Sequence, residues 1–494
     1  MPGGKRNPFS VTTLLQTIEG LVRFPKSKPK SESKPVSASV FVDLEIQFIG
    51  ASELPKMDVV GIADPYFVAK LDNRISFVSN VIKNTDMPVW NEVWKIKNVP
   101  TTATLQVVVM DKDEGKMTDG YVGEFEMTVD AGAKEVEIQG PMLRRNRGNF
   151  WLKIESTPTS DRDQALKFPY LFNGPIRYSR HFSPTAGLFT NLDEARLYST
   201  WKIYIRGVPL FFGDTYQHWN ANHIPAASIF QGPTSLAIRS GIQAGHRMLY
   251  ARTATNGYGV IENTTDMMQI LHAGSVKRSA NATTTIQKRH MDRVKPAIYT
   301  YIISSEDDSF RFSETDAAFF VDYASKHALE SNCSETVRYS GEFHPRPKGG
   351  WRYFKDEIED DEVDWEFVID NDSGTYAPDK DLLPKVKELL EFNFPGLGIC
   401  AWDREDERLK ESVEDCREYA RKYRGVGKDE ANDEDKALMD QATKRDSDGR
   451  GGDETIHRKN SSTASGSSGG ANGSDSPPDA LASCTNSAPG DTPR

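Results

Sequence analysis

Cysteine is scarce in this sequence, and long apolar runs are missing from it. Only four cysteines occur in 494 residues, at positions 333, 400, 416 and 484. Because they lie far apart, neither a disulfide framework nor a zinc site built on closely spaced cysteines is expected. No apolar stretch approaches the roughly 20 residues of a membrane-spanning helix, and no apolar signal region follows the N-terminus. We therefore expect a cytoplasmic protein.

The sequence also lacks an excess of positive charge. It has 61 Lys and Arg against 72 Asp and Glu, which gives a net charge of −11. Proteins that bind nucleic acid usually carry a strong positive field, so nucleic acid is not an expected partner. The phosphate-binding GxxxxGK[ST] loop and the HExxH zinc motif are absent as well. Motifs therefore identify no catalytic residue.

The two ends of the chain differ from its centre. At this length one compact core is not expected, because domains usually run to about 50–250 residues. Residues 1–37 form a basic arm with one helical stripe of apolar residues, Leu14, Leu15, Ile18, Leu21 and Val22. Three interpretations stay open: a helix lying on a membrane surface, a helix docked on the protein's own core, and an unstructured arm. Residues 425–494 have almost no large apolar side chains, which predicts a disordered tail.

Residues 38–156 show a period of two. In VFVDLEIQFI the apolar residues Val40, Val42, Leu44, Ile46 and Phe48 alternate with mostly polar ones. Seven similar short runs follow, separated by turn residues: YFVAKL, ISFVSNVI, EVWKIKN, TLQVVVM, YVGEFEMTV, KEVEIQ and NFWLKIE. Eight short strands in about 120 residues predict an all-β, eight-stranded antiparallel β-sandwich.

Residues 160–424 have mixed character. The aromatic-rich runs WKIYIRGVPLFF, residues 201–212, and AIYTYIIS, residues 297–304, predict strands. Helices are predicted for TDAAFFVDYASKHAL, DLLPKVKELLEF and REDERLKESVEDCREYARKYR. We therefore expect an α+β domain after the sandwich.

Five aspartates flank the turns of the predicted sandwich. Calcium prefers six to eight oxygen ligands, which flexible carboxylates, carbonyls and water can supply. Two loops at one end of a sandwich could bring such carboxylates into one pocket. The five residues are Asp58, Asp64, Asp111, Asp113 and Asp119.

The same stretches resemble a known family. The segments LPKMDVVGIADPYFVAKL, KNTDMPVWNEVWKI and VVVMDKDEGKMTDGYVGEFEM are similar to calcium-dependent C2 domains of the protein-kinase-C and synaptotagmin type. The resemblance covers nearly all of residues 40–156 and implies that the family's five calcium ligands fall on the five aspartates. The whole arrangement resembles fungal proteins with an N-terminal C2 domain, whose C-terminal regions imply no reaction.

The C2 resemblance implies Ca²⁺-dependent binding to anionic phospholipid. Calcium would neutralise the repelling carboxylates and leave coordination positions for lipid oxygens. The apolar loop residues Val59, Val60, Ile62 and Met117 are the predicted membrane contacts, although packing against one another would explain them equally well.

Three hypotheses of function remain at this point. In the first, the C2 domain brings residues 160–424 to the cytosolic face of a membrane as an adaptor or scaffold, with a possible protein partner. In the second, residues 160–424 are a membrane-targeted enzyme, and a pocket should collect several polar candidates: Asp214, His218, His223, His327 and His344. In the third, the sandwich is mainly a protein-interaction module.

Overall fold

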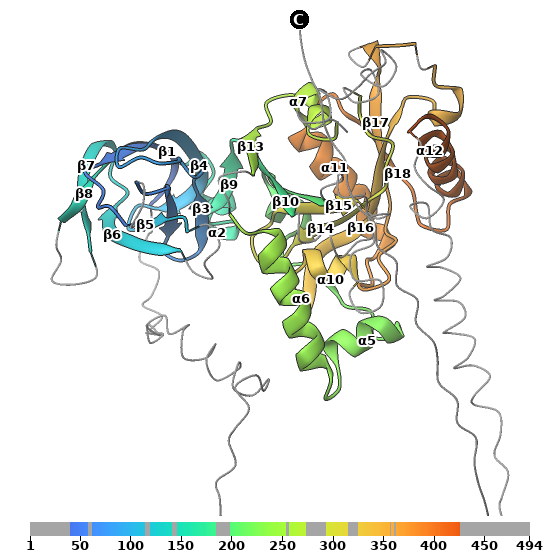
Figure 1. The fold of residues 1–494 in the computed structure, drawn as a ribbon, viewed down its shortest axis with the longest axis horizontal. Coiled ribbons are helices and arrows are strands. Elements are labelled where there is room, and N and C mark those ends of the chain that lie inside the picture. Colours follow the sequence, from blue (N-terminus) through green and yellow to red (C-terminus); the bar gives the residue numbers. More distant parts are fainter. Residues whose placement is uncertain are drawn as a thin grey trace, which may run out of the picture. The chain divides into compact units, whose positions relative to one another are not determined.

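The computed structural model describes residues 40–57, 62–113, 119–140, 146–183, 198–252, 256–272, 293–314, 325–355, 357–359 and 362–424. All of them belong to one unit of the chain, residues 1–435. The predicted basic arm of residues 1–37 and the predicted tail of residues 425–494 lie outside the described residues. Two antiparallel-rich sheets, one after the other in the chain, form the folded part (Figure 1).

The first sheet confirms the predicted β-sandwich. Its strands are hydrogen-bonded in the order β3-β2-β5-β6-β7-β8-β1-β4-β9, and all its pairs are antiparallel. The first eight strands correspond to the eight predicted runs: β1 (Phe41–Ser52), β2 (Pro65–Leu71), β3 (Ile75–Val78), β4 (Val89–Pro100), β5 (Thr104–Asp111), β6 (Gly120–Thr128), β7 (Gly132–Gln139) and β8 (Asn146–Pro158). The ninth strand, β9 (Leu171–Gly174), was not predicted, because its sequence LFNG shows no alternation of apolar and polar residues.

Alternating apolar residues close this sheet around one core. In β1 the side chains of Leu44, Ile46 and Phe48 are buried while their neighbours are partly exposed. Aromatic rings fill the centre, with Phe48 and Phe67 at 4.6 Å between ring centroids and Phe67 and Phe150 at 5.4 Å. Full burial of one such side chain stabilises the fold by about 1.5–3 kcal/mol. The strands of the sandwich therefore share one continuous apolar core.

The second sheet confirms the predicted α+β character. Its order is β13-β10-β11-β15-β14-β16-β17-β18, with β12 also paired to β16, and β17 and β18 are parallel. The strands are β10 (Arg177–Ser183), β11 (Tyr198–Tyr204), β12 (Gln217–His218), β13 (Gly257–Val260), β14 (Tyr299–Ser304), β15 (Phe310–Glu314), β16 (Thr336–Pro347), β17 (Trp365–Ile369) and β18 (Gly398–Ala401).

Helices surround this second sheet (Figure 1). The main core takes apolar residues from α4 (Val208–Phe212), α7 (Thr264–Gln269), α11 (Leu383–Asn393) and α12 (Glu407–Arg424). A smaller cluster joins α5 (Ile224–Phe230), α6 (Ser235–Leu249) and α10 (Lys326–Glu330). The remaining helical segments among the described residues are α2 (Arg162–Lys167) and the 3-10 turns η1 (Trp351–Tyr353) and η3 (Lys380–Leu382). Helices were predicted over the residues of α10, α11 and α12, and residues 315–324 of the first of these predictions lie outside the described residues.

The prediction of one strand over residues 201–212 was wrong in its second half. The strand β11 ends at Tyr204, and residues 208–212 form the helix α4. Gly207 has a φ of 73°, a left-handed conformation that interrupts an extended chain, and Pro209 stands at the start of the helix, where it suits the fixed φ of proline. The apolar run VPLFF reads equally well as a buried strand or a buried helix.

The passage from the first sheet to the second is short and anchored. β9 ends at Gly174 and β10 begins at Arg177. The guanidinium of Arg177 donates to the carbonyl oxygen of Val78 over 3.1 Å, pairs with Glu92, and lies over the Phe77 ring at 4.2 Å. Arg177 therefore ties the first strand of the second sheet to the end of β3.

Candidate functional site

Two of the predicted aspartates meet because of strand register. Asp64 immediately precedes β2, and Asp111 is the last residue of β5. These strands pair antiparallel with Pro65 opposite Asp111, so the start of one lies beside the end of the other. The backbone N–H of Asp64 donates to Oδ1 of Asp111 over 2.6 Å. The two loops that the sequence analysis paired thus meet at one end of the sandwich.

Asp119 reaches the same end through the next strand. It precedes Gly120, the first residue of β6, which stands opposite Asp111 in the pairing of β5 with β6. Its Oδ2 accepts a hydrogen bond from the hydroxyl of Tyr66 over 2.7 Å, and its Oδ1 pairs with the ammonium of Lys112, also over 2.7 Å. Asp119 is therefore held by a neutral donor on one oxygen and a cation on the other.

Asp113 also faces this end. A Cβ placed on Gly120 would lie 3.3 Å from Cβ of Asp111 and 3.6 Å from Oδ2 of Asp113. Both aspartates of the Asp-Lys-Asp sequence thus border the same small space beside Gly120. Asp111 is 1% exposed, while Asp64, Asp113 and Asp119 are partly exposed.

A third loop, which the sequence analysis did not assign to the site, supports Asp64. Oδ1 of Asp64 accepts the backbone N–H of Asn84 over 2.6 Å, and Oδ1 of Asn84 accepts the N–H of Ile62 over 3.1 Å. Asn84 has a φ of 52°, which asparagine tolerates better than most residues. The signal for this loop was present in KNTDMPVWNE, where Asn84 and Pro88 mark a turn before β4.

Burial shapes the chemistry of Tyr66. Its surroundings raise the pKa of the Tyr66 hydroxyl far above the usual value, first through burial and then through the adjacent carboxylate of Asp119. The hydroxyl consequently stays protonated at physiological pH and remains a hydrogen-bond donor to Asp119.

Most of the other predicted site residues lie outside the described part of the chain. Asp58, Val59, Val60 and Met117 lie outside the described residues, and Ile62 is described and partly exposed. Within the described part of the chain, no group of three or more His, Cys, Asp or Glu side chains is arranged to hold a metal ion. The donor set still suits calcium chemically, because four described carboxylates border one end of the sandwich and oxygen is the ligand that calcium prefers.

The polar candidates of the second region differ in exposure and in their partners. Asp214 and His218 are exposed, and His223 precedes α5. His327 and His344 are buried, where their Nε2 atoms contact the Gly341 carbonyl oxygen at 3.1 Å and Ser412 Oγ at 2.8 Å. Burial lowers the pKa of His327 to about 4 and that of His344 to about 3, so both rings are neutral at physiological pH. Buried, neutral histidines with such hydrogen-bond partners are typical of residues that stabilise a fold.

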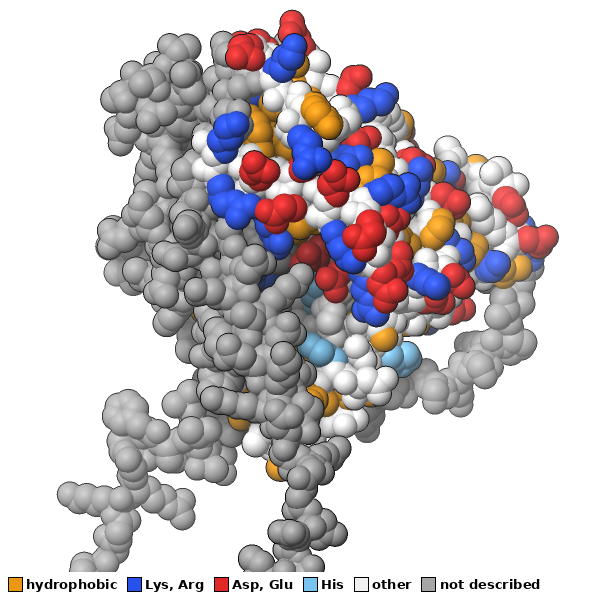
Figure 2. Space-filling model, turned by 90° about the vertical axis from the view of Figure 1, so that its right-hand side faces the viewer, with side chains coloured by type: hydrophobic (Ala, Val, Ile, Leu, Met, Phe, Trp, Pro, Cys, Tyr) orange, Lys and Arg blue, Asp and Glu red, His pale blue; other side chains and the backbone are white. Residues whose placement is uncertain are grey.

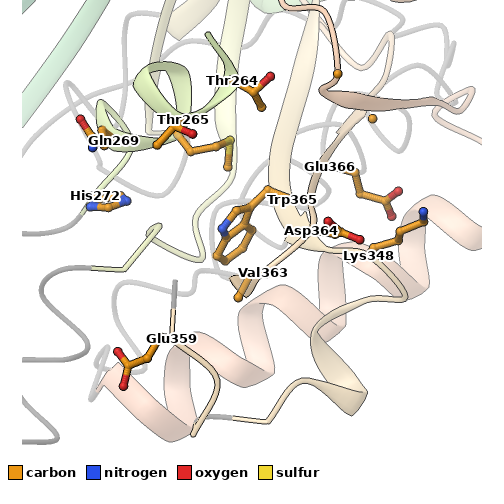
Figure 3. Close-up of a pocket in the computed structure, with 13 residues that line it drawn as sticks. Thr264, Thr265, Gln269, His272, Lys348, Glu359, Val363, Asp364, Trp365 and Glu366 are labelled. Atoms are coloured by element: carbon orange, nitrogen blue, oxygen red, sulfur yellow. The ribbon is translucent and has the colours of Figure 1, made fainter. Parts of the chain in front are cut away.

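A pocket of about 580 Å³ opens beside Trp365 (Figure 3). Gln269 and His272 lie on one side of the Trp365 ring, and Lys348 and Asp364 lie on the other. None of the five polar candidates of the second region lines it. The pocket therefore gives the enzyme hypothesis no support from the residues that the hypothesis named.

The charges around α12 are mixed in sign. On the face shown in Figure 2, Lys and Arg side chains alternate with Asp and Glu, and apolar side chains are scattered. Several of these charges pair locally, such as Lys410 with Glu407 at 2.7 Å and Arg352 with Glu411 at 2.8 Å. Such a face resembles an ordinary hydrated surface rather than a docking site for anionic lipid.

Comparison with known proteins addresses the first sheet. The family model described as "C2 domain" matches residues 42–144. Residues 42–144 belong to the C2 family. The match contains Asp64, Asp111, Asp113 and Asp119 and the strands that position them, from β1 to β7.

Individual curated proteins are also similar to part of this chain. "Multiple C2 domain and transmembrane region protein 8" of Arabidopsis thaliana is 42% identical over 81 residues, which are 16% of this chain and 8% of that protein. Human synaptotagmin-1 is 29% identical over 181 residues, 33% of this chain and 37% of that protein. The chain thus spans well under two thirds of the length of these relatives. Among solved structures, a C2 domain of plant extended synaptotagmin 1 aligns with 22% identity and a TM-score of 0.22, over 25% of this chain and 100% of that one.

None of the described helices combines the length and the apolar character that crossing a membrane requires.

Proposed function

We propose that this protein is a Ca²⁺-dependent, phospholipid-binding peripheral membrane protein. Its C2 domain would dock on anionic membranes at their cytosolic face and bring the α+β region, residues 160–424, there as an adaptor or scaffold. The observation that carries the proposal is the hydrogen bond of 2.6 Å from the Asp64 N–H to Asp111 Oδ1. It brings two acidic loops together at one end of the C2 domain.

The residues that would hold calcium are Asp58, Asp64, Asp111, Asp113 and Asp119. Bound calcium would supply positive charge to the carboxylates and coordination positions to lipid oxygens. Asp111 is nearly inaccessible, so it would contact calcium from the buried side of the site. The partly exposed Asp64, Asp113 and Asp119 border solvent. Asn84 fixes the orientation of the Asp64 carboxylate through the N–H bond of 2.6 Å.

The membrane contacts in this proposal are Val59, Val60, Ile62 and Met117. They belong to the same two loops as the aspartates, so a domain that meets lipid through its calcium end would present them first. Each apolar side chain that leaves water would contribute up to about 1.5–3 kcal/mol to membrane affinity.

Cosedimentation with liposomes tests the proposal. The full chain is mixed with phosphatidylserine-containing vesicles, or with phosphatidylcholine vesicles alone, in calcium or in chelator. We expect sedimentation only with the anionic vesicles in calcium, and its loss in the double variant Asp111→Asn with Asp113→Asn. Asp130→Asn is the matched control, because Asp130 is exposed and follows the opposite end of β6. A chain that stays in the supernatant at saturating calcium contradicts the proposal.

A further inference from the structure

Lys112 stands between two of the proposed calcium ligands and pairs with a third. Its backbone N–H donates to the carbonyl oxygen of Asp64 over 3.0 Å, which fixes the start of its side chain beside the first acidic loop. Its ammonium then reaches Oδ1 of Asp119 over 2.7 Å. The side chain is only 11% exposed and that of Asp119 16%, so the pair is largely shielded from water.

Both carboxylate oxygen atoms of Asp119 accept a hydrogen bond. Oδ1 accepts from Lys112, and Oδ2 accepts from the Tyr66 hydroxyl at 2.7 Å. Tyr66 is neutral and belongs to the rigid strand β2, so it orients the carboxylate without changing the charge of the site. Lys112 adds a full positive charge on a flexible four-carbon stem. The two donors therefore have different consequences for a cation that approaches Asp119.

The surrounding charges explain why a lysine fits here. Asp64, Asp111, Asp113 and Asp119 border one end of the sandwich, and carboxylates at short range repel one another when ionised. An ammonium on Asp119 offsets part of this repulsion in the absence of metal. A divalent cation that takes Asp119 as a ligand would meet the ammonium at close range, and like charges in a shielded position repel strongly.

We propose that Lys112 is a tethered cation that competes with calcium for Asp119 and so lowers the calcium affinity of the C2 domain. The inference rests on the proposed function and adds its regulation by a residue of the chain itself. Calcium binding displaces the ammonium from Oδ1, and the flexible stem lets it move to solvent while the backbone bond to Asp64 holds its Cα in place. The calcium concentration at which the protein responds is consequently set in part by Lys112.

Calorimetric titration of the full chain with calcium chloride tests the competition. Lys112→Met keeps the apolar stem and removes the charge, and we expect it to bind calcium roughly three- to tenfold more tightly than the wild type, as expected for loss of one shielded ion pair. Lys112→Arg keeps the charge and should stay within about twofold of the wild type. Lys56→Met is the control for a general change of electrostatic potential, because it removes an exposed charge just before the first acidic loop. It should change the calcium affinity less than about twofold.

Thermal unfolding gives a second readout that a merely structural lysine would not produce. In chelator, Lys112→Met should unfold at a lower temperature than the wild type, because Asp119 has lost its counter-charge. In saturating calcium the difference should vanish or reverse. A lysine that only stabilises the fold would lower the unfolding temperature under both conditions and would weaken calcium binding.

The outcomes separate this inference from the proposed function. If the wild type binds calcium and Lys112→Met binds it equally or less tightly, the competition is overturned and the proposed function stands. If only Lys112→Met binds measurably, the competition is supported in its strongest form. If neither protein binds calcium, both proposals are wrong.

Discussion

The backbone N–H of Asp64 lies 2.6 Å from Oδ1 of Asp111, although 47 positions separate the two residues in the sequence. Because Asp111 is 1% exposed, its carboxylate serves both as an acceptor that joins two loops and as a proposed ligand. Two substitutions separate these roles. Asp111→Asn keeps an oxygen acceptor and loses the charge, whereas Asp111→Ala loses both.

We expect Asp111→Asn to fold with nearly unchanged stability and to bind calcium at least about tenfold more weakly, since one charged ligand is worth about 1.4 kcal/mol or more. Asp111→Ala should in addition lose up to about 1–3 kcal/mol of unfolding free energy, because the partly buried Asp64 N–H is left without its acceptor. Urea unfolding in chelator and calorimetric calcium titration measure the two effects. Equal calcium affinity of wild type and Asp111→Asn would remove Asp111 from the ligand set.

Asn84 should stabilise the loop beside the proposed calcium ligand Asp64 through its backbone geometry. Its φ of 52° and its bond to the Ile62 N–H are separate contributions. Asn84→Gly keeps the left-handed conformation and loses the side-chain acceptor, while Asn84→Val also introduces strain of about 1–3 kcal/mol at a β-branched residue. We expect unfolding free energy to fall in the order wild type, Asn84→Gly, Asn84→Val in urea titrations. The reverse order of the two variants would show that the conformation is not the constraint.

Val60 should matter for lipid and not for calcium. We predict that Val60→Asp weakens cosedimentation with phosphatidylserine vesicles by roughly tenfold, because a charge replaces an apolar side chain at the loop that is proposed to meet the membrane. Calcium affinity in the absence of lipid should remain within about twofold, since the side chain is not a proposed ligand. Val260→Asp serves as the control, because Val260 is 43% exposed on β13 of the second sheet. A parallel loss in the control would assign the effect to net charge.

His344 should make the fold sensitive to acid. Burial, followed by the charges of Arg346 and Arg417, lowers the pKa of His344 to about 3. Because its pKa in the unfolded chain is near 6.5, its contribution to stability is fully present above pH 6.5 and is lost as pH falls toward 3, at up to about 1.4 kcal/mol per pH unit. His344→Gln has no such proton to take up. The difference in unfolding free energy between wild type and variant should therefore shrink between about pH 7 and pH 5 in urea titrations.

Glu330 should act in the opposite direction. Its complete burial raises the pKa to about 7, although Tyr250, Ser313 and Arg311 oppose this shift. The folded state keeps the proton where the unfolded chain has lost it, so stability is greatest below about pH 4.5 and falls as pH rises to about 7. We expect Glu330→Gln to gain roughly 2–3 kcal/mol relative to wild type between about pH 4.5 and pH 8. A constant difference across this range would show that Glu330 is not protonated in the fold.

The sequence alone determined the β-sandwich and identified most of the aspartates of the proposed calcium site. The alternation in VFVDLEIQFI puts Leu44, Ile46 and Phe48 on one face whatever the rest of the chain does, and eight such runs leave few other folds. The resemblance to C2 domains then pointed to the acidic loops. Where periodicity was ambiguous, as in VPLFF, the prediction failed, because a short apolar run suits a buried helix or a buried strand.

Only the tertiary structure determined which of these residues contact one another. The pairing of Pro65 with Asp111 brings Asp64 to its acceptor, and the pairing of Asp111 with Gly120 brings Asp119 within reach of Lys112 and Tyr66. No local pattern predicts these contacts, because they depend on strand register over distances of up to 53 residues. The burial of His327 and His344, likewise, is a property of the assembled second core and not of the residues around them in the chain.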